Sequence, residues 1–190
     1  MQGDSKMYIV NFFKHLHTVN KHRFYVFKLC LKAGIPIRGL LHDLSKYSPV
    51  EFFEGVKYFN GKRSPIPACI KEKGYSKAWL HHKGKNKHHF EYWVDFSQEE
   101  KGPVIPYKYA VEMVCDTLAA GLVYNGKEWT KESQLNYYNR RKDKEYINPK
   151  IQKFLVTVYE EVAAYGIDKT ITSKNLKKIY NESIATKENN

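Results

Sequence analysis

The eight histidines of the chain lie in segments that could bring them together around an acid. His42 is followed directly by Asp43, beside leucines on both sides, and a buried carboxylate is costly unless a cation compensates it. Four further histidines fall within nine residues: His81, His82, His88 and His89. Because neutral imidazoles and a carboxylate are the ligands of divalent transition metals, these residues predict a metal site.

Helical spacing turns some of these side chains inward. His15 and His22 share a stripe with Val19 and Val26 at intervals of four and three residues, whereas His17 points elsewhere. A lone histidine on an apolar face is usually a core residue. Two histidines on one stripe weaken that interpretation.

The same argument applies to the later histidines and to one acid. His82 follows Trp79 by three residues, which turns His82 inward and leaves His81 on the flank. His88 and His89 are adjacent, so only one of them is expected to be a ligand. On an expected helix over 107–124, Asp116 and Glu112 lie opposite the main apolar stripe. Buried acids need a counter-charge, and an ion pair with a Lys or Arg is the simplest partner for either acid alone.

The elements that would position these residues are all helical. No alternation of period two persists, so the prediction is an all-α single domain over 1–190. We expect a helix over 7–33, a short helix from Pro36 through the His42-Asp43 pair, and a third from a capping box at Ser48-Pro49-Val50-Glu51 to about 60. Two short helices should follow, from Ser76 to His82 and, after a break at Gly84, from Asn86 to Trp93. The remaining helices are expected over 107–124, 130–142, 148–166 and 173–184.

Composition limits the partners. The formal net charge is +12, which favours an anionic partner: a phosphorylated small molecule, a nucleic acid or an acidic surface. A solvated lysine-rich surface is the plainer interpretation. Cys30, Cys69 and Cys115 form no metal-binding pair and are expected to be reduced core residues. With no signal peptide or membrane-spanning run, we expect a cytoplasmic protein without a membrane partner. The sequence does not predict an oligomeric state.

The order His22, His42-Asp43, the histidine pairs and then Asp116 resembles the HD-domain superfamily of metal-dependent phosphohydrolases, whose signature is His…His-Asp…Asp. The resemblance covers about 15–125. It implies an HD-domain-like helical bundle with a catalytic core over about 7–125, accessory helices over 129–184 and a frayed tail over 185–190. Members with additional histidines hold two or three metals.

The resemblance also implies site roles. The first metal would take His22, His42, Asp43 and Asp116. Asp43 would bridge to a second metal bound by His82 and by His88 or His89. The cofactors would be divalent transition ions, two or more, chosen from Mn, Fe, Co, Ni or Zn.

Asp43 and Lys46 are the expected catalytic residues, because Lys46 can reach a phosphate oxygen. Further candidate substrate contacts are Arg38, Lys83, Lys85, Asn86 and Lys87, although a solvated loop explains each lysine and a helix cap explains Asn86 more simply. Expected outer-shell partners are Glu91, Glu112 and His81.

The sequence departs from the family in two places. Ser45 replaces glycine in the His-Asp-x-Gly-Lys form of the motif, and only twenty residues separate His22 from His42. No Gly-Tyr-Pro element follows the histidines, so a cyclic-di-GMP substrate is not expected.

Three functions are left open. The first is a phosphohydrolase, either a phosphomonoesterase or a phosphodiesterase, acting on a nucleotide or another small phosphorylated substrate through a metal-activated water. The second is an HD-type di-iron oxygenase. The third is a basic nucleic-acid-binding module, with histidines as structural zinc ligands and the segment 137–142 stacking on bases.

Overall fold

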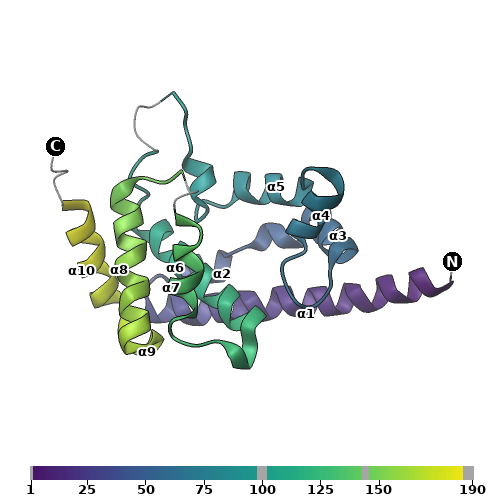
Figure 1. The fold of residues 1–190 in the computed structure, drawn as a ribbon, viewed down its shortest axis with the longest axis horizontal. Helices are drawn as coiled ribbons and strands as arrows, with labels where there is room; N and C mark the ends of the chain where they lie inside the picture. The colour runs from purple at the N-terminus through teal and green to yellow at the C-terminus, as the bar shows by residue number, and fades with distance from the viewer. Residues whose placement is uncertain (1, 98–101, 143–145, 186–190) are drawn as a thin grey trace.

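The computed structural model describes residues 2–97, 102–142 and 146–185, and these residues form only helices and connections (Figure 1). The predicted all-α class is confirmed. The helices are α1 Gln2–Lys32, α2 Pro36–Leu41, α3 Pro49–Tyr58, α4 Ile66–Lys73, α5 Lys77–Lys85, α6 Tyr107–Asn125, α7 Ser133–Asn139, α8 Pro149–Tyr165, α9 Ile167–Thr170 and α10 Ser173–Ala185. Short 3-10 turns are η1 Leu44–Tyr47, η2 Phe90–Trp93 and η3 Gly126–Glu128.

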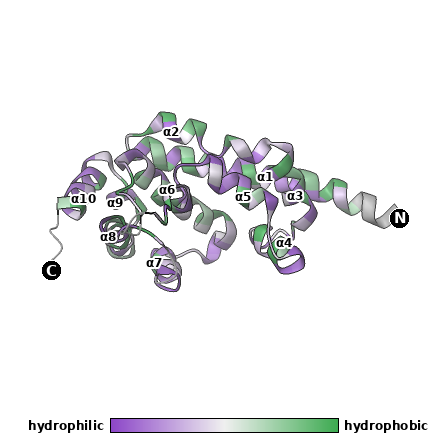
Figure 2. Ribbon diagram, turned by 90° about the horizontal axis from the view of Figure 1, so that it is seen from above, coloured by the Kyte–Doolittle hydropathy of each residue, from purple (hydrophilic) through white to green (hydrophobic). Residues whose placement is uncertain are grey.

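The long helix α1 supports both ends of the molecule. Helix α3 packs on its N-terminal half and in turn contacts α4 and α5, whereas α6 packs on its C-terminal half and contacts α8 and α10 (Figure 1). Seen from above, α6 lies between α2 on one side and α7 and α8 on the other (Figure 2). The groove between these two groups of helices is where the histidines converge.

The main apolar core lies on the C-terminal side of that groove. It joins Val26 and Cys30 of α1 to Leu118 of α6, Phe154 of α8 and Leu176 of α10, all of them fully buried. Burial of such side chains contributes roughly 1.5–3 kcal/mol each. The helices over 149–185 therefore supply part of the core that fixes α1 and α6, the two helices that carry His22 and Asp116.

Several boundaries agree with the sequence patterns. Helices α6, α8 and α10 begin and end close to the predicted residues, and Ser76 Oγ caps α5 by accepting from the Trp79 backbone N–H at 3.0 Å. No helix in the described ranges combines the length and apolarity needed to cross a bilayer. The predicted frayed tail falls on residues 186–190, which lie outside the described residues.

Other local predictions were wrong. His42 and Asp43 follow α2 rather than lying within it, and Gly84 does not break α5, which continues to Lys85. Asn86 is the C-cap of α5 and not the start of the next helix. Helix α4 is absent from the predicted helices, although Pro, which occurs in its first turn, is well suited to that position. Helix α7 covers only the central part of the span predicted for it.

Candidate metal centre

The turn that carries His42 and Asp43 has an unusual backbone. Asp43 adopts φ 52°, a left-handed conformation that costs a non-glycine residue about 1–3 kcal/mol. Arg23 of α1 holds the turn in place, because its guanidinium donates to the carbonyl of His42 at 2.8 Å and to that of Leu40 at 2.9 Å. The turn thereby delivers two adjacent side chains into the same buried space.

His22, His42, Asp43 and Asp116 form the first ligand group. His22 Nε2 lies 3.0 Å from Asp116 Oδ1 and 3.4 Å from His42 Nε2, and His42 Nε2 lies 3.3 Å from Asp43 Oδ2. One donor atom from each residue lies within 4.8 Å of the others. The structure thus brings together the four residues predicted for a first metal.

Asp43, His82, His88 and His89 form the second ligand group. His82 Nε2 and His88 Nε2 each lie 3.4 Å from Asp43 Oδ1. The expectation that only one of His88 and His89 would be a ligand does not match this arrangement. These two residues lie in a turn before η2, where adjacent side chains need not diverge as they do on a helix.

Asp43 is shared, and each of its oxygens faces a different group. Neither oxygen accepts a hydrogen bond of good geometry from the described residues, and the buried Nε2 atoms of His88 and His89 also lack partners. Donors about 2.1 Å from a common ion lie about 3.0–3.4 Å apart at octahedral or tetrahedral angles. Most of the separations given above lie in this range, and that of His22 Nε2 from Asp43 Oδ2 is 3.8 Å, so both groups could hold a metal ion.

Glu112 lies behind the first group and is fully buried. Its Oε1 is 3.1 Å from His42 Nδ1, and its Oε2 accepts from Arg38 Nε at 2.7 Å. Burial opposes its ionisation, but hydrogen bonds from His42 and His88 outweigh this effect and lower the Glu112 pKa to about 2. Arg38 also lies over the ring of Tyr109, so the structure gives it two partners of its own, and its contact with a substrate stays a prediction.

Glu51 lies behind the second ligand group, where it binds histidine nitrogens as Glu112 does behind the first. The sequence analysis did not predict this role for Glu51. Its two oxygens lie 2.6 Å from His81 Nδ1 and 2.8 Å from His82 Nδ1. The capping-box pattern had explained Glu51 as part of a helix start, yet Ser48 makes no side-chain cap bond. His81 accordingly takes the outer position predicted for it, through a partner thirty residues away in sequence.

The charges of the centre compensate one another. Burial works against ionisation of Asp43, but His42 and Lys46 outweigh it and hold the Asp43 pKa well below its usual value. Lys46 Nζ lies 3.1 Å from Asp43 Oδ2. Burial lowers the pKa of both His22 and His89, which favours the neutral, ligating form of each ring.

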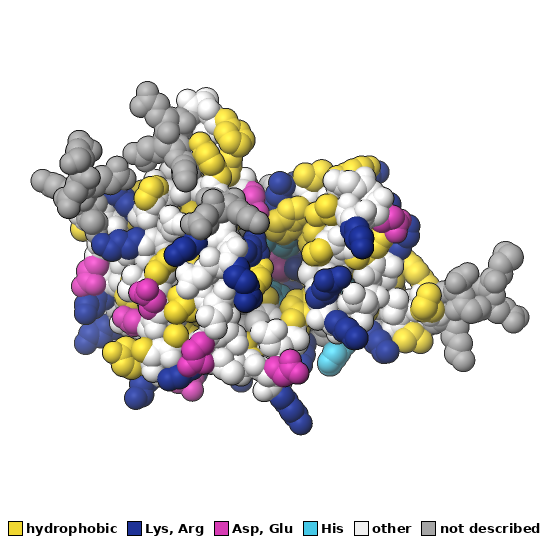
Figure 3. Space-filling view, viewed as in Figure 1, with side chains coloured by type: hydrophobic (Ala, Val, Ile, Leu, Met, Phe, Trp, Pro, Cys, Tyr) yellow, Lys and Arg dark blue, Asp and Glu magenta, His cyan; other side chains and the backbone are white. Residues whose placement is uncertain are grey.

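Both groups open into one cavity of about 600 Å³. Its wall includes ligand residues of each group together with Lys46, Glu91 and Trp79. Figure 3 shows a hollow between the two halves of the molecule with histidine and acidic atoms at its floor. This volume is typical of pockets that enclose small organic ligands.

Most of the other predicted substrate contacts are not in the cavity wall. Lys83, Lys85 and Lys87 do not line it, and Lys87 instead lies over the ring of Tyr92. Asn86 donates to Ser45 Oγ and to the His82 carbonyl, both at 2.8 Å, so its role is structural. Lys83 and Lys85 belong to α5 and Lys87 to the turn after it, and the contact of these lysines with a substrate stays a prediction.

Glu91 does line the cavity, but it makes no hydrogen bond to a histidine within the described ranges, contrary to its predicted outer role. Its Oε2 is buried without a partner, and burial raises its pKa. His15 also lies in the cavity wall and belongs to neither ligand group. The three cysteines are free and buried and belong to neither ligand group, although Cys69 lines the cavity.

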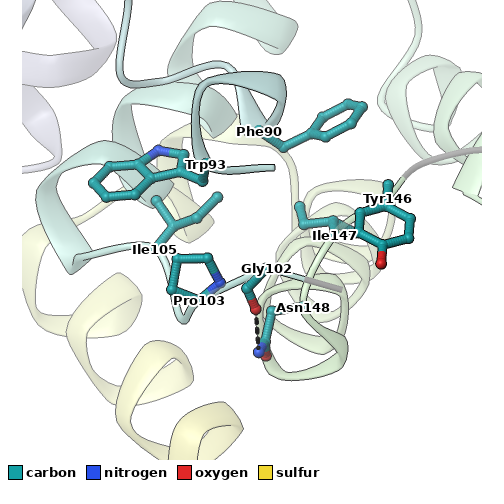
Figure 4. Close-up of a pocket in the computed structure, with 8 residues that line it drawn as sticks. All are labelled: Phe90, Trp93, Gly102, Pro103, Ile105, Tyr146, Ile147 and Asn148. Atoms are coloured by element: carbon teal, nitrogen blue, oxygen red, sulfur yellow. Dashed lines mark hydrogen bonds between the residues drawn. The ribbon is translucent and has the colours of Figure 1, made fainter. Parts of the chain in front are cut away.

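A second hollow lies behind η2 and is too narrow to admit a water molecule (Figure 4). It is bounded by Phe90 and Trp93 on one side and by Ile147 and Asn148 on the other. Asn148 Nδ2 donates to the Gly102 carbonyl at 3.0 Å, as Figure 4 shows. This region is a packing contact that fixes the end of the histidine turn.

Comparison with known proteins gives one match. A family model described as a family of unknown function, DUF5662, matches residues 11–161. No curated protein and no solved structure matches the chain. The matched region includes every residue of both ligand groups and most of the helices around them. The chain therefore belongs to the DUF5662 family.

Proposed function

We propose that this protein is a metal-dependent phosphohydrolase that acts on a small phosphorylated molecule, with nucleotides among the candidates. The observation that carries the proposal is the shared carboxylate: Asp43 offers one oxygen to each of two ligand groups, and both groups open into the same cavity. The order of these ligands along the chain supports an HD-type architecture.

The ligand sets are histidine-rich with one or two carboxylates each, which suits Mn, Fe, Co, Ni or Zn better than Mg or Ca. A pair of such ions, when bound, activates water and neutralises charge on a phosphoryl group. Glu112 and Glu51 hold the outer nitrogens of His42 and His82, which leaves the inner nitrogens directed at the ligand groups.

Lys46 is the residue best placed to help a phosphate. It lines the cavity, and its ammonium lies beside Asp43, where charge would increase on the phosphoryl oxygens during transfer. A positive charge at this position would stabilise the negative charge of a phosphate ester and would contribute less to the binding of a neutral substrate. This is the feature that ranks hydrolysis above the di-iron oxygenase, for which the same ligands would serve.

The nucleic-acid module has less support. In the segment predicted to stack on bases, Tyr138 is buried and Tyr137 is stacked by Arg141, and both tyrosines line the cavity. This segment does not offer an open row of aromatic faces for a single strand.

The test is phosphate release from a panel of nucleotides and sugar phosphates after reconstitution with Mn²⁺, Fe²⁺, Co²⁺, Ni²⁺ or Zn²⁺. We expect at least one substrate to be hydrolysed, and we expect His42→Ala and Asp116→Ala to abolish this activity. Lys85→Ala is the matched control, because Lys85 is exposed and outside the cavity wall. Absence of hydrolysis with every metal, or oxygen consumption by the iron form in its place, would contradict the proposal.

A further inference from the structure

The cavity of the metal centre has a second charged region that the proposed chemistry does not use. Lys62 and Arg63, between α3 and α4, line it on one side, and Arg140 and Arg141, at the end of α7, line it on the other. All four side chains are exposed, so they lie at the opening of the cavity rather than on its floor. Figure 3 shows basic side chains on both sides of the hollow. We call these four residues the distal basic cluster.

Three of these cations are available to a ligand. Lys62, Arg63 and Arg140 form no ion pair with a carboxylate in the part of the chain that the structure describes. Arg141 is packed over the ring of Tyr137 with its guanidinium 5.1 Å from the ring centroid. Among the residues that the structure describes, the opening of the cavity therefore carries three cations, Lys62, Arg63 and Arg140, without a carboxylate partner.

Two acids of the cavity wall, Glu51 and Glu54, are already engaged by other groups, whereas Glu91 interacts electrostatically with Arg141 of the cluster. Glu51 is bound by His81 and His82. Glu54 accepts from Ser76 Oγ at 2.5 Å and from the Ala78 backbone N–H at 3.0 Å. An anion that enters the cavity thus finds cations with free donors at the opening.

The size of the cavity shows how far a ligand would extend. A volume of about 600 Å³ is that of a pocket for a whole organic ligand, whereas a phosphate ion occupies a small part of it. Aromatic side chains line the remaining wall: Trp79, Phe90, Tyr124 and Tyr137. Trp79 also stacks against the ring of His82, with centroids 6.0 Å apart, so this aromatic part of the wall directly adjoins a residue of the second ligand group.

We propose that the substrate carries two anionic groups at opposite ends of an organic body: a scissile phosphate at the metal centre and a second phosphate held by the distal basic cluster. This inference rests on the proposed function for the first group only. The second group would be bound by Arg63 or Arg140 at its own side of the opening, since one guanidinium can donate two parallel N–H bonds to phosphate oxygens. Neither arginine lies among the metal ligands, so recognition of the second group is separable from the chemistry.

The experiment compares two series of synthetic probes on protein that retains the metals it holds when purified. One series is alkane-α,ω-diol bisphosphates of increasing chain length, and the other is alkyl monophosphates of the same lengths. Binding is measured by calorimetry. We expect the best bisphosphate to bind about tenfold or more tightly than its matched monophosphate, as expected for charge-assisted hydrogen bonds.

The variant Arg63→Ala/Arg140→Ala should lose this gain and keep the monophosphate affinity, whereas Lys85→Ala should change neither. Because both arginines are exposed, the double variant should also unfold at the wild-type temperature.

The outcomes separate the two proposals. If bisphosphates gain nothing over monophosphates, the two-anion substrate is overturned, even where phosphate release from monophosphates upholds the phosphohydrolase. If the gain is present and depends on the two arginines but no probe is hydrolysed, the distal site stands and the proposed function fails. Loss of single-stranded oligonucleotide binding in the double variant, with no bisphosphate gain in the wild type, would overturn the inference in favour of a nucleic-acid partner.

Discussion

Replacement of Glu112 by glutamine tests how much the buried acid behind the first ligand group contributes. Glu112 is fully buried, accepts from Arg38 at 2.7 Å and lies 3.1 Å from His42 Nδ1. Its pKa falls from 4.5 to about 2, which corresponds to about 3 kcal/mol in favour of the ionised form. Glutamine keeps the shape but loses the charge, so Glu112→Gln should lower the free energy of unfolding by about 2–3 kcal/mol.

The sign and size of this effect can be followed with pH and temperature. A carboxyl with a lowered pKa in the folded state stabilises the protein above pH 4.5, and this contribution is lost as the pH falls toward about 2. At pH 7 the loss should therefore be complete. For a chain of 190 residues it corresponds to a decrease of about 5–10 °C in the unfolding temperature.

The assay is thermal unfolding at pH 7 with excess chelator, followed by calorimetry or circular dichroism. Asp168→Asn is the control, because it removes one partner of the exposed pair between Lys32 and Asp168 and should leave the unfolding temperature nearly unchanged. A separate titration should show metal affinity reduced about 10–100-fold in Glu112→Gln, since His42 loses the group that orients it. An unfolding temperature within about 1 °C of the wild type would refute the reasoning.

Three further predictions follow from the same contacts. Asp116→Asn should leave one bound metal and Asp43→Asn none, as measured by elemental analysis, because only Asp43 belongs to both ligand groups; equal losses would contradict its bridging position. Burial, and to a smaller extent the charge of Lys46, lowers the His15 pKa from 6.5 to about 4. As the pH falls from 6.5 to 4, the free energy of unfolding of the metal-free wild type should therefore decrease by up to about 3 kcal/mol relative to that of His15→Gln. A difference between the two proteins that does not change with pH would count against this. Gly55→Ala would place a methyl group 2.3 Å from His15 Nε2 and should destabilise the protein by about 1–3 kcal/mol in urea unfolding, whereas Gly84→Ala, with open space around it, should be neutral or stabilising.

The sequence was informative wherever a local pattern decides the outcome. The periodic apolar residues of α6 and α8 predicted these helices closely, and the interval from His15 to His22 placed both on the buried face of α1. The histidines were conspicuous for the same reason, whereas their division into two ligand groups was predicted from the resemblance to the HD-domain superfamily.

The rest depends on contacts between residues distant in sequence. The pairing of Arg38 with Glu112 spans 74 positions, and that of Glu51 with His82 spans 31, so no local pattern contains either of them. Charge alone made Lys83, Lys85 and Lys87 plausible phosphate contacts, yet none of them lines the cavity. The turn that carries Lys87 is held by Trp93, whose Nε1 donates to the Lys87 carbonyl at 2.8 Å. Tertiary packing also overrode the helix-breaking tendency of Gly84.

The spread of the ligands along the chain has a consequence for folding. Residues 22 to 116 must all be in place before either ligand group exists, so a cation would bind the native state and not the unfolded chain. At a free concentration one thousand times the dissociation constant, each ion would add about 4 kcal/mol to native-state stability. A cell that runs short of the metal would then lose the protein to proteolysis as well as its activity, which makes metal supply a control on abundance.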